Sequence, residues 1–112
     1  MKNIFKPNKY HAQPSGGYAS RKEHRRAQEL HLLQRAGIIT DLREQVPYTL
    51  IPTQRGPDGK VVERACTYIA DFVYRDKLGN TIVEDTKGVR TKEYIIKRKL
   101  MRHIHGITIT ER

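Results

Sequence analysis

The sequence is poor in the residues that form disulfides, thiolate metal sites and membrane spans. Its single cysteine, Cys66, cannot form a disulfide within the chain, which favours a reducing cytoplasm. No CxxC pair, Gly-rich phosphate loop or Ser/His/Asp set is visible, and the five histidines are not spaced to chelate one ion. The sequence contains no apolar run of about 18 residues and does not begin with the apolar stretch of a signal peptide. We therefore expect a cytoplasmic protein with no membrane partner.

Positive charge is what the sequence has in excess, and it is concentrated toward the two ends. Lysine and arginine number 22 against 12 acidic residues, a formal net charge of +10. Residues 1–37 carry eight basic and two acidic side chains, residues 91–112 carry six and two, and residues 38–90 carry eight of each. Basic flanks around an acidic centre suit a polyanion that is bound along its backbone. Nucleic acid is the first partner to consider, and charge that serves only solubility or ribosome association is the alternative.

The length of 112 residues is enough for one domain with a single hydrophobic core. Residues 1–19, with prolines, glycines and lysines, predict a flexible basic N-terminal arm, and residues 20–112 predict the folded domain. A helix is expected over residues 21–36, because Ser20 can cap its start and Gly37 can end it.

Three β-prone segments, a second helix and a short last strand are expected after this helix. Pro47 favours an edge position or a β-bulge for the first strand, and a Gly79-Asn80 turn joins the next two. Because a crossover helix most simply joins parallel strands, the last strand should run parallel to the third. The predicted fold is α/β, bordering on α+β, with αβββαβ order and a mixed four-stranded sheet flanked by helices. The expected bounds are strands 45–51, 61–74 and 81–87, a helix 92–105 and a strand 107–110.

Two acids and a lysine lie among apolar residues of the predicted strands. Asp85 and Lys87 are two residues apart, so a strand turns both to one face, and Asp71 lies on the neighbouring strand. Carboxylates on an apolar face are costly unless something binds them. Oxygen ligands without sulfur or histidine favour Mg²⁺, for which Mn²⁺ can substitute. The alternative is a charged hairpin with ordinary cross-strand Asp–Lys pairing.

Further residues are candidates around this metal. Thr86 could supply its backbone carbonyl, and Lys87 could position or help deprotonate a water. Glu23 shares a helix face with Ala27, so its carboxylate could join the acids directly or through water. Its position three residues after Ser20 suits a capping box equally well. Glu84 alternates to the other face and is a second-choice ligand, because a β-bulge would exchange it with Asp85.

The ordered set of acid, hairpin, acid-x-Lys, helix and strand, preceded by a helical Glu, resembles the PD-(D/E)XK nuclease superfamily. More closely, the chain is similar over about residues 18–111 to a family of small phage and prophage proteins catalogued as a domain of unknown function. Ala70 stands where the name-giving proline would be, and Asp85 replaces the commoner Glu. The segments that carry the closer resemblance are Tyr18-Ala-Ser-Arg-Lys-Glu23, Leu32-Leu-Gln-Arg-Ala-Gly37, Gln45-Val, Tyr68-Ile-Ala-Asp-Phe-Val-Tyr74 and Val83-Glu-Asp-Thr-Lys-Gly88.

The resemblance implies a Mg²⁺-dependent endonuclease that hydrolyses DNA phosphodiester bonds, for example on double-stranded, branched, recombining or replicating phage DNA, and it allows a homodimer. Its catalytic residues would be Glu23, Asp71, Asp85 and Lys87. The alternatives are an inactive nuclease-fold module that only binds DNA, and an RNA- or ribosome-binding basic protein, for which stacking aromatic residues are not evident. The side chains expected to bind backbone phosphates are Lys9, Arg21, Lys22, Arg25, Arg26, Lys97, Arg98, Lys99 and Arg102.

Overall fold

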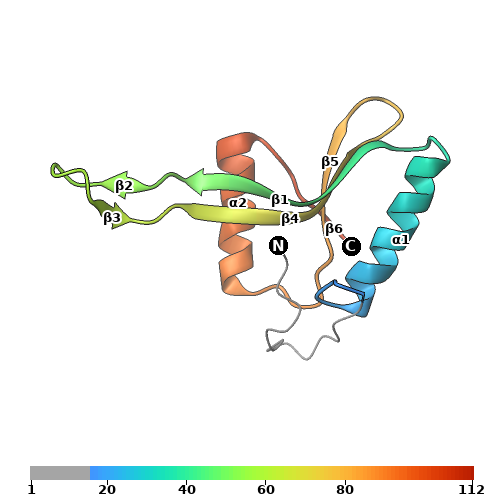
Figure 1. Cartoon of the computed structure of the whole chain (residues 1–112), viewed down its shortest axis with the longest axis horizontal. Helices are drawn as coiled ribbons and strands as arrows, with labels where there is room; N and C mark the ends of the chain where they lie inside the picture. The colour runs from blue at the N-terminus through green and yellow to red at the C-terminus, as the bar shows by residue number, and fades with distance from the viewer. Residues whose placement is uncertain (1–15) are drawn as a thin grey trace.

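The computed structural model describes residues 16–112, which form a mixed four-stranded sheet and two helices (Figure 1). The sheet order is β1-β4-β5-β6, with antiparallel pairing from β1 to β5 and parallel pairing between β5 and β6. The predicted α/β class and the mixed sheet with a parallel last strand are confirmed. The elements are α1 (Arg21–Arg35), β1 (Thr40–Ile51), β2 (Gln54–Arg55), β3 (Val61–Glu63), β4 (Cys66–Arg75), β5 (Thr81–Asp85), α2 (Lys92–His105) and β6 (Thr110–Glu111).

The helix ends follow the caps that the sequence offers. Ser20 Oγ accepts a hydrogen bond from the Glu23 amide at 3.1 Å, and Thr91 Oγ1 accepts one from the Tyr94 amide at 3.1 Å. Gly106 ends α2 with a φ of 67°, which glycine adopts without a steric penalty. The predicted bounds of α2 are confirmed, and α1 ends one residue earlier than expected.

The strands differ from the prediction at four places. The strand predicted over 81–87 is β5, which ends at Asp85 and leaves Thr86 and Lys87 outside the strand. β1 begins at Thr40 and keeps Pro47 on the sheet edge, as expected. The segment predicted as one strand over 61–74 forms two, and β3 pairs with β2 in a separate ribbon that extends away from the rest of the molecule (Figure 1). The last strand starts at Thr110, because the Ile107 amide still bonds the Met101 carbonyl at 3.3 Å and so completes the end of α2.

Two hydrophobic clusters hold the helices against the sheet. Tyr94 and Met101 of α2 pack in one cluster with Tyr68 and Val73 of β4. Leu30 of α1 packs in the other, together with Ala27, Ile39, Phe72 and Tyr74. Phe72 and Val73 are neighbours in β4 and point to opposite faces, so α1 and α2 cover opposite faces of the sheet.

The predicted arm over residues 1–19 lies mostly outside the described residues. Within the described part, Tyr18 packs against the α1 cluster, and its ring stacks on His24 with centroids 5.3 Å apart. The folded domain therefore starts before residue 20. Within residues 16–112, neither helix is long and apolar enough to cross a membrane.

Candidate functional site

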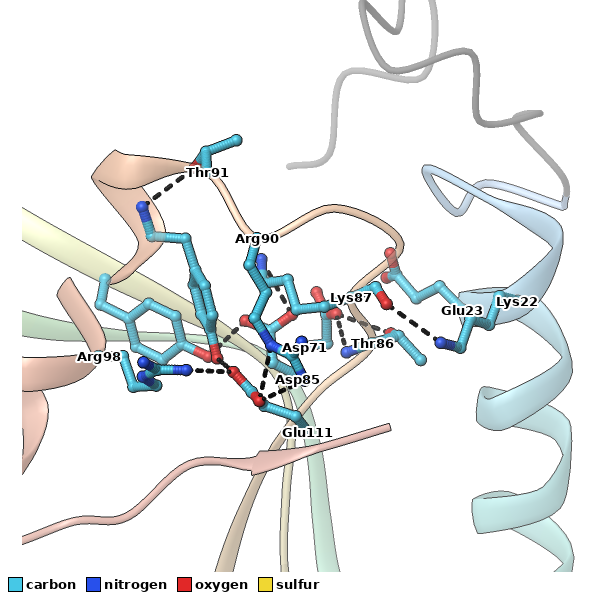
Figure 2. Close-up of polar contacts among 12 residues, drawn as sticks. Lys22, Glu23, Asp71, Asp85, Thr86, Lys87, Arg90, Thr91, Arg98 and Glu111 are labelled. Carbon is cyan, nitrogen blue, oxygen red and sulfur yellow. Dashed lines mark hydrogen bonds and ion pairs between the residues drawn. The ribbon is translucent and has the colours of Figure 1, made fainter. Parts of the chain in front are cut away.

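The predicted acids and lysine meet in a pocket of about 530 Å³ between the N-terminal ends of the two helices. Asp71 enters from β4, and Asp85 and Lys87 enter from the end of β5 and the segment that follows it (Figure 2). Glu23 of α1 and Tyr94 of α2 line opposite sides. Residues from both ends of the domain thus converge on one place.

Asp85 is the most buried carboxylate of the pocket, with 2% of its surface exposed. Its Oδ2 accepts a hydrogen bond from the Tyr68 hydroxyl at 2.5 Å, and its Oδ1 lies 3.2 Å from Lys87 Nζ. Lys87 Nζ also lies 4.2 Å from the centre of the Tyr94 ring, which attracts a cation. Asp85 and Lys87 thus meet as expected, although β5 ends at Asp85 and Lys87 lies in the segment after the strand.

Burial makes the negative charge of Asp85 costly. It raises the pKa of this carboxyl to about 7, and the neighbouring charge of Asp71 acts in the same direction. The Tyr68 hydrogen bond and the Lys87 charge lower the pKa, but less. Asp85 Oδ1 is buried, and its contact with Lys87 Nζ is an ion pair without hydrogen-bond geometry. A buried carboxylate oxygen that accepts no hydrogen bond among the described residues retains the capacity to bind a ligand such as a cation.

Asp71 is held in place by the residue that follows Asp85. Its Oδ2 accepts hydrogen bonds from the Thr86 amide at 3.0 Å and from the Thr86 hydroxyl at 2.8 Å. Its Oδ1 lies 3.4 Å from the side-chain amide nitrogen of Gln45. The same nitrogen donates to Glu23 Oε2 at 3.1 Å. Glu23 therefore reaches the pair of aspartates through Gln45.

The donor set is compatible with a hard divalent cation. Asp71 and Asp85 offer carboxylate oxygens, which are the ligands that Mg²⁺ and Mn²⁺ prefer. Oδ1 of Asp85, which is ion-paired with Lys87, accepts no hydrogen bond from the described residues. Within residues 16–112, no three side chains of His, Cys, Asp or Glu are grouped closely enough to hold one ion. Glu23 is thus not assembled with the two aspartates as a third direct ligand.

Two sequence predictions are corrected on the other face of β5. Glu84, the second-choice ligand, is fully buried and accepts hydrogen bonds from both the Arg26 guanidinium, at 2.5 and 3.1 Å, and the Tyr74 hydroxyl, at 2.6 Å. Arg26, a predicted phosphate contact, has only 12% of its side chain exposed. Strand alternation turns Glu84 away from Asp85, so this ion pair ties α1 to the sheet and faces no ligand.

The remaining predicted phosphate contacts fall into two groups. Lys97 pairs with Glu93 at 3.2 Å, and Arg98 pairs with Glu111 at 3.2 Å. Glu111 also accepts from the Tyr94 hydroxyl and Arg90, and these bonds lower its pKa to about 2. Lys9 lies outside the described residues. The exposed predicted contacts are Arg21, Lys22, Arg25, Lys99 and Arg102.

Sequence reasoning missed the site residues that carry no charge. Gln45, Tyr68 and Tyr94 contact the predicted acids and lysine. Tyr68 is three residues before Asp71, and strict strand alternation would turn the two side chains to opposite faces. No spacing signal could have placed Tyr68 in the pocket.

The fold and the pocket define a small α/β domain in which an aspartate from the middle of β4 meets an aspartate and a lysine at the end of β5. The chain belongs to the family described as Protein of unknown function (DUF1064), whose family model matches residues 8–108. Comparisons with curated proteins and with solved structures find no match. The predicted membership of a domain family of unknown function is confirmed, and the wider relation to the PD-(D/E)XK superfamily stays a prediction.

Proposed function

We propose that this protein is a metal-dependent endonuclease that hydrolyses phosphodiester bonds of DNA, as a member of the PD-(D/E)XK superfamily. The observation that carries the proposal is the convergence of Asp71, Asp85 and Lys87 in one open pocket, where the buried Oδ1 of Asp85 is ion-paired with Lys87 but accepts no hydrogen bond. A domain that needed this acid only for folding would also give that oxygen a hydrogen-bond donor.

Mg²⁺ or Mn²⁺ would be held by the carboxylates of Asp71 and Asp85 and by the backbone carbonyl of Thr86, which lies between the end of β5 and Lys87. The metal would lower the pKa of an attacking water and offset charge on the phosphate. Lys87 lies on the Asp85 side of the pocket, where its ammonium group can orient a water or a phosphate oxygen. The Tyr94 ring and Asp85 together restrict the position of Lys87 Nζ. Tyr68 fixes the orientation of the Asp85 carboxylate.

Basic residues of α1 flank the pocket where a DNA backbone would approach. Arg21 and Lys22 are exposed in the first turn of α1, beside the pocket-lining residue Ser20. Lys22 Nζ donates to the Lys87 carbonyl at 3.1 Å, which ties this turn of α1 to the lysine segment (Figure 2). These contacts place positive charge beside the carboxylates, as a phosphodiester substrate requires.

A cleavage panel tests the proposal. Purified protein is incubated with linear duplex, single-stranded, flapped and four-way-junction DNA in Mg²⁺, Mn²⁺ or EDTA. We expect cleavage with either metal and none in EDTA. The variants Asp71→Asn and Lys87→Met should lower the rate by about 100-fold or more while DNA binding persists. Asp58→Asn, at the tip of the β2–β3 ribbon, is the matched control. Cleavage that is unchanged in both site variants would refute the assignment.

A second candidate is a nuclease-fold module that binds DNA without cutting it. It is favoured by the absence of a third grouped carboxylate within the described residues, and by the internal partners that Asp85 already has in Tyr68 and Lys87. This module would bind DNA in the panel without cleavage and would show no heat of Mn²⁺ binding. Competition between single-stranded RNA and DNA separates both from an RNA-binding protein.

A further inference from the structure

Gln45 has a backbone conformation that is unusual for its residue type and its place in a strand. Its φ is 53°, and among the described residues only Asp41 shares a positive φ without being glycine. Left-handed backbone is costly for a residue with a Cβ atom, and such residues cluster at functional sites when the surrounding structure holds them. Gln45 lies in the middle of β1, where neither a turn nor a helix end requires this conformation.

At Gln45 and at the residue opposite it, the side chains of β1 and β4 switch from one face of the sheet to the other. In β4, Ala70 packs with the α2 cluster and Phe72 with the α1 cluster, although strict alternation would turn both to one face. In β1, Leu42 packs with the α1 cluster and Val46 with the α2 cluster, and a register shift between Thr40 and Arg43 contributes to that difference. The register pairs Glu44 with Phe72 and Val46 with Ala70. Gln45 and Asp71 therefore lie opposite each other where the side chains change face.

The side chain of Gln45 connects two acids that come from different elements. Its amide nitrogen donates to Glu23 Oε2 of α1 at 3.1 Å and lies 3.4 Å from Asp71 Oδ1 of β4. Glu23 is only 4% exposed, so water screens its charge poorly. Its carboxylate and that of Asp71 therefore repel each other unless a hydrogen-bond donor lies between them. A neutral amide supplies that donor without neutralising either charge.

We propose that Gln45 is a positioning residue of the active site. Its strained backbone directs the side-chain amide between Glu23 and Asp71 and thereby sets the distance and orientation of the two carboxylates. The inference rests on the proposed function, because Asp71, which Gln45 orients, is a proposed metal ligand. Glycine would adopt the same backbone freely but would leave the two acids without their shared donor.

Substitution of Gln45 by glycine separates the effect of its backbone conformation from the effect of its side-chain amide. Gln45→Gly relieves the backbone strain and removes the side-chain amide, and because these two effects on stability oppose each other we expect a melting temperature close to that of the wild type. Mn²⁺ affinity and the single-turnover cleavage rate should fall by about 10- to 100-fold, the effect of losing a residue that orients a metal ligand. Asp41→Gly relieves the same backbone strain in the same strand, away from the pocket, and is the matched control.

The outcomes decide between positioning and a merely structural role. A stable Gln45→Gly protein with weakened Mn²⁺ binding and cleavage, beside an unchanged Asp41→Gly protein, supports the proposal. Wild-type Mn²⁺ affinity and cleavage in Gln45→Gly would overturn it, and so would losses that follow a lowered melting temperature. Gln45→Asn, which tolerates left-handed backbone and keeps a shorter amide, should recover part of the lost affinity.

The proposed function can fail separately. If the wild type neither cleaves DNA nor binds Mn²⁺, the nuclease proposal is wrong, and the role of Gln45 is then read from carbon-13 NMR. The carboxyl resonances of Glu23 and Asp71 should both shift in Gln45→Gly, because both lose the same donor. Unchanged resonances would overturn the positioning role whatever the function of the pocket.

Discussion

Asp85 should make the folded protein less stable at neutral pH than at mildly acidic pH. Burial raises the pKa of its carboxyl from 3.8 to about 7, whereas in the unfolded chain the ordinary value returns. Between these two values the folded state holds the proton that the unfolded state has released, so stability falls as the pH rises. At about 1.4 kcal/mol per pKa unit, the full cost above pH 7 is about 4 kcal/mol.

Asp85→Asn removes this titration with little change of shape, since the amide oxygen can still accept from Tyr68. Urea denaturation of both proteins in metal-free buffer, at about pH 5 and about pH 8, measures the effect. The wild type should lose about 2–3 kcal/mol more than the variant between these conditions. Glu111, with its lowered pKa, titrates below this window and is common to both proteins. Equal losses in the two proteins would refute the reasoning.

Three further predictions concern the contacts around the site. Arg26→Met should cost about 3 kcal/mol in urea denaturation, because it leaves the buried Glu84 with only the Tyr74 hydroxyl and the more distant Arg112, whereas the exposed neighbour substitution Arg25→Met should be nearly neutral. Adding Glu84→Gln to Arg26→Met should recover part of that loss, and no recovery would contradict the buried ion pair. Tyr94→Phe should retain single-turnover cleavage because it keeps the ring beneath the lysine ammonium, while Tyr94→Leu should lower it; equal rates in the two variants would exclude a role for the ring. Lys99→Ala should reduce the slope of log affinity for DNA against log salt by about one, as measured by fluorescence anisotropy, and an unchanged slope would remove Lys99 from the DNA contacts.

Local signals predicted the helices and most of the sheet. Ser20, Thr91 and Gly106 act on their immediate neighbours, so their effect on helix ends is readable from the sequence. The i, i+2 spacing of Asp85 and Lys87 likewise brought two charges to one face. The start of β6 was misplaced because Ile107 completes the helix end through its backbone, which residue type does not reveal.

The long-range features of the site could not be predicted in this way. Arg26 and Glu84 are 58 residues apart, and only the packing of α1 on β5 shows that they pair. The change of face at Gln45 carries no glycine or proline to signal it, and it decides which side chains of β1 and β4 meet. Alternation alone would therefore have excluded Tyr68 from the pocket that it completes.

Mg²⁺-dependent cleavage of DNA by the wild type and by Asp85→Ala tests the central claim most directly. Circular dichroism first shows that the variant is folded, and anisotropy shows that it still binds DNA. We predict that the wild type cuts DNA in Mg²⁺ and not in EDTA, and that Asp85→Ala binds DNA without cutting it. Undiminished cleavage by the folded Asp85→Ala protein would contradict the account.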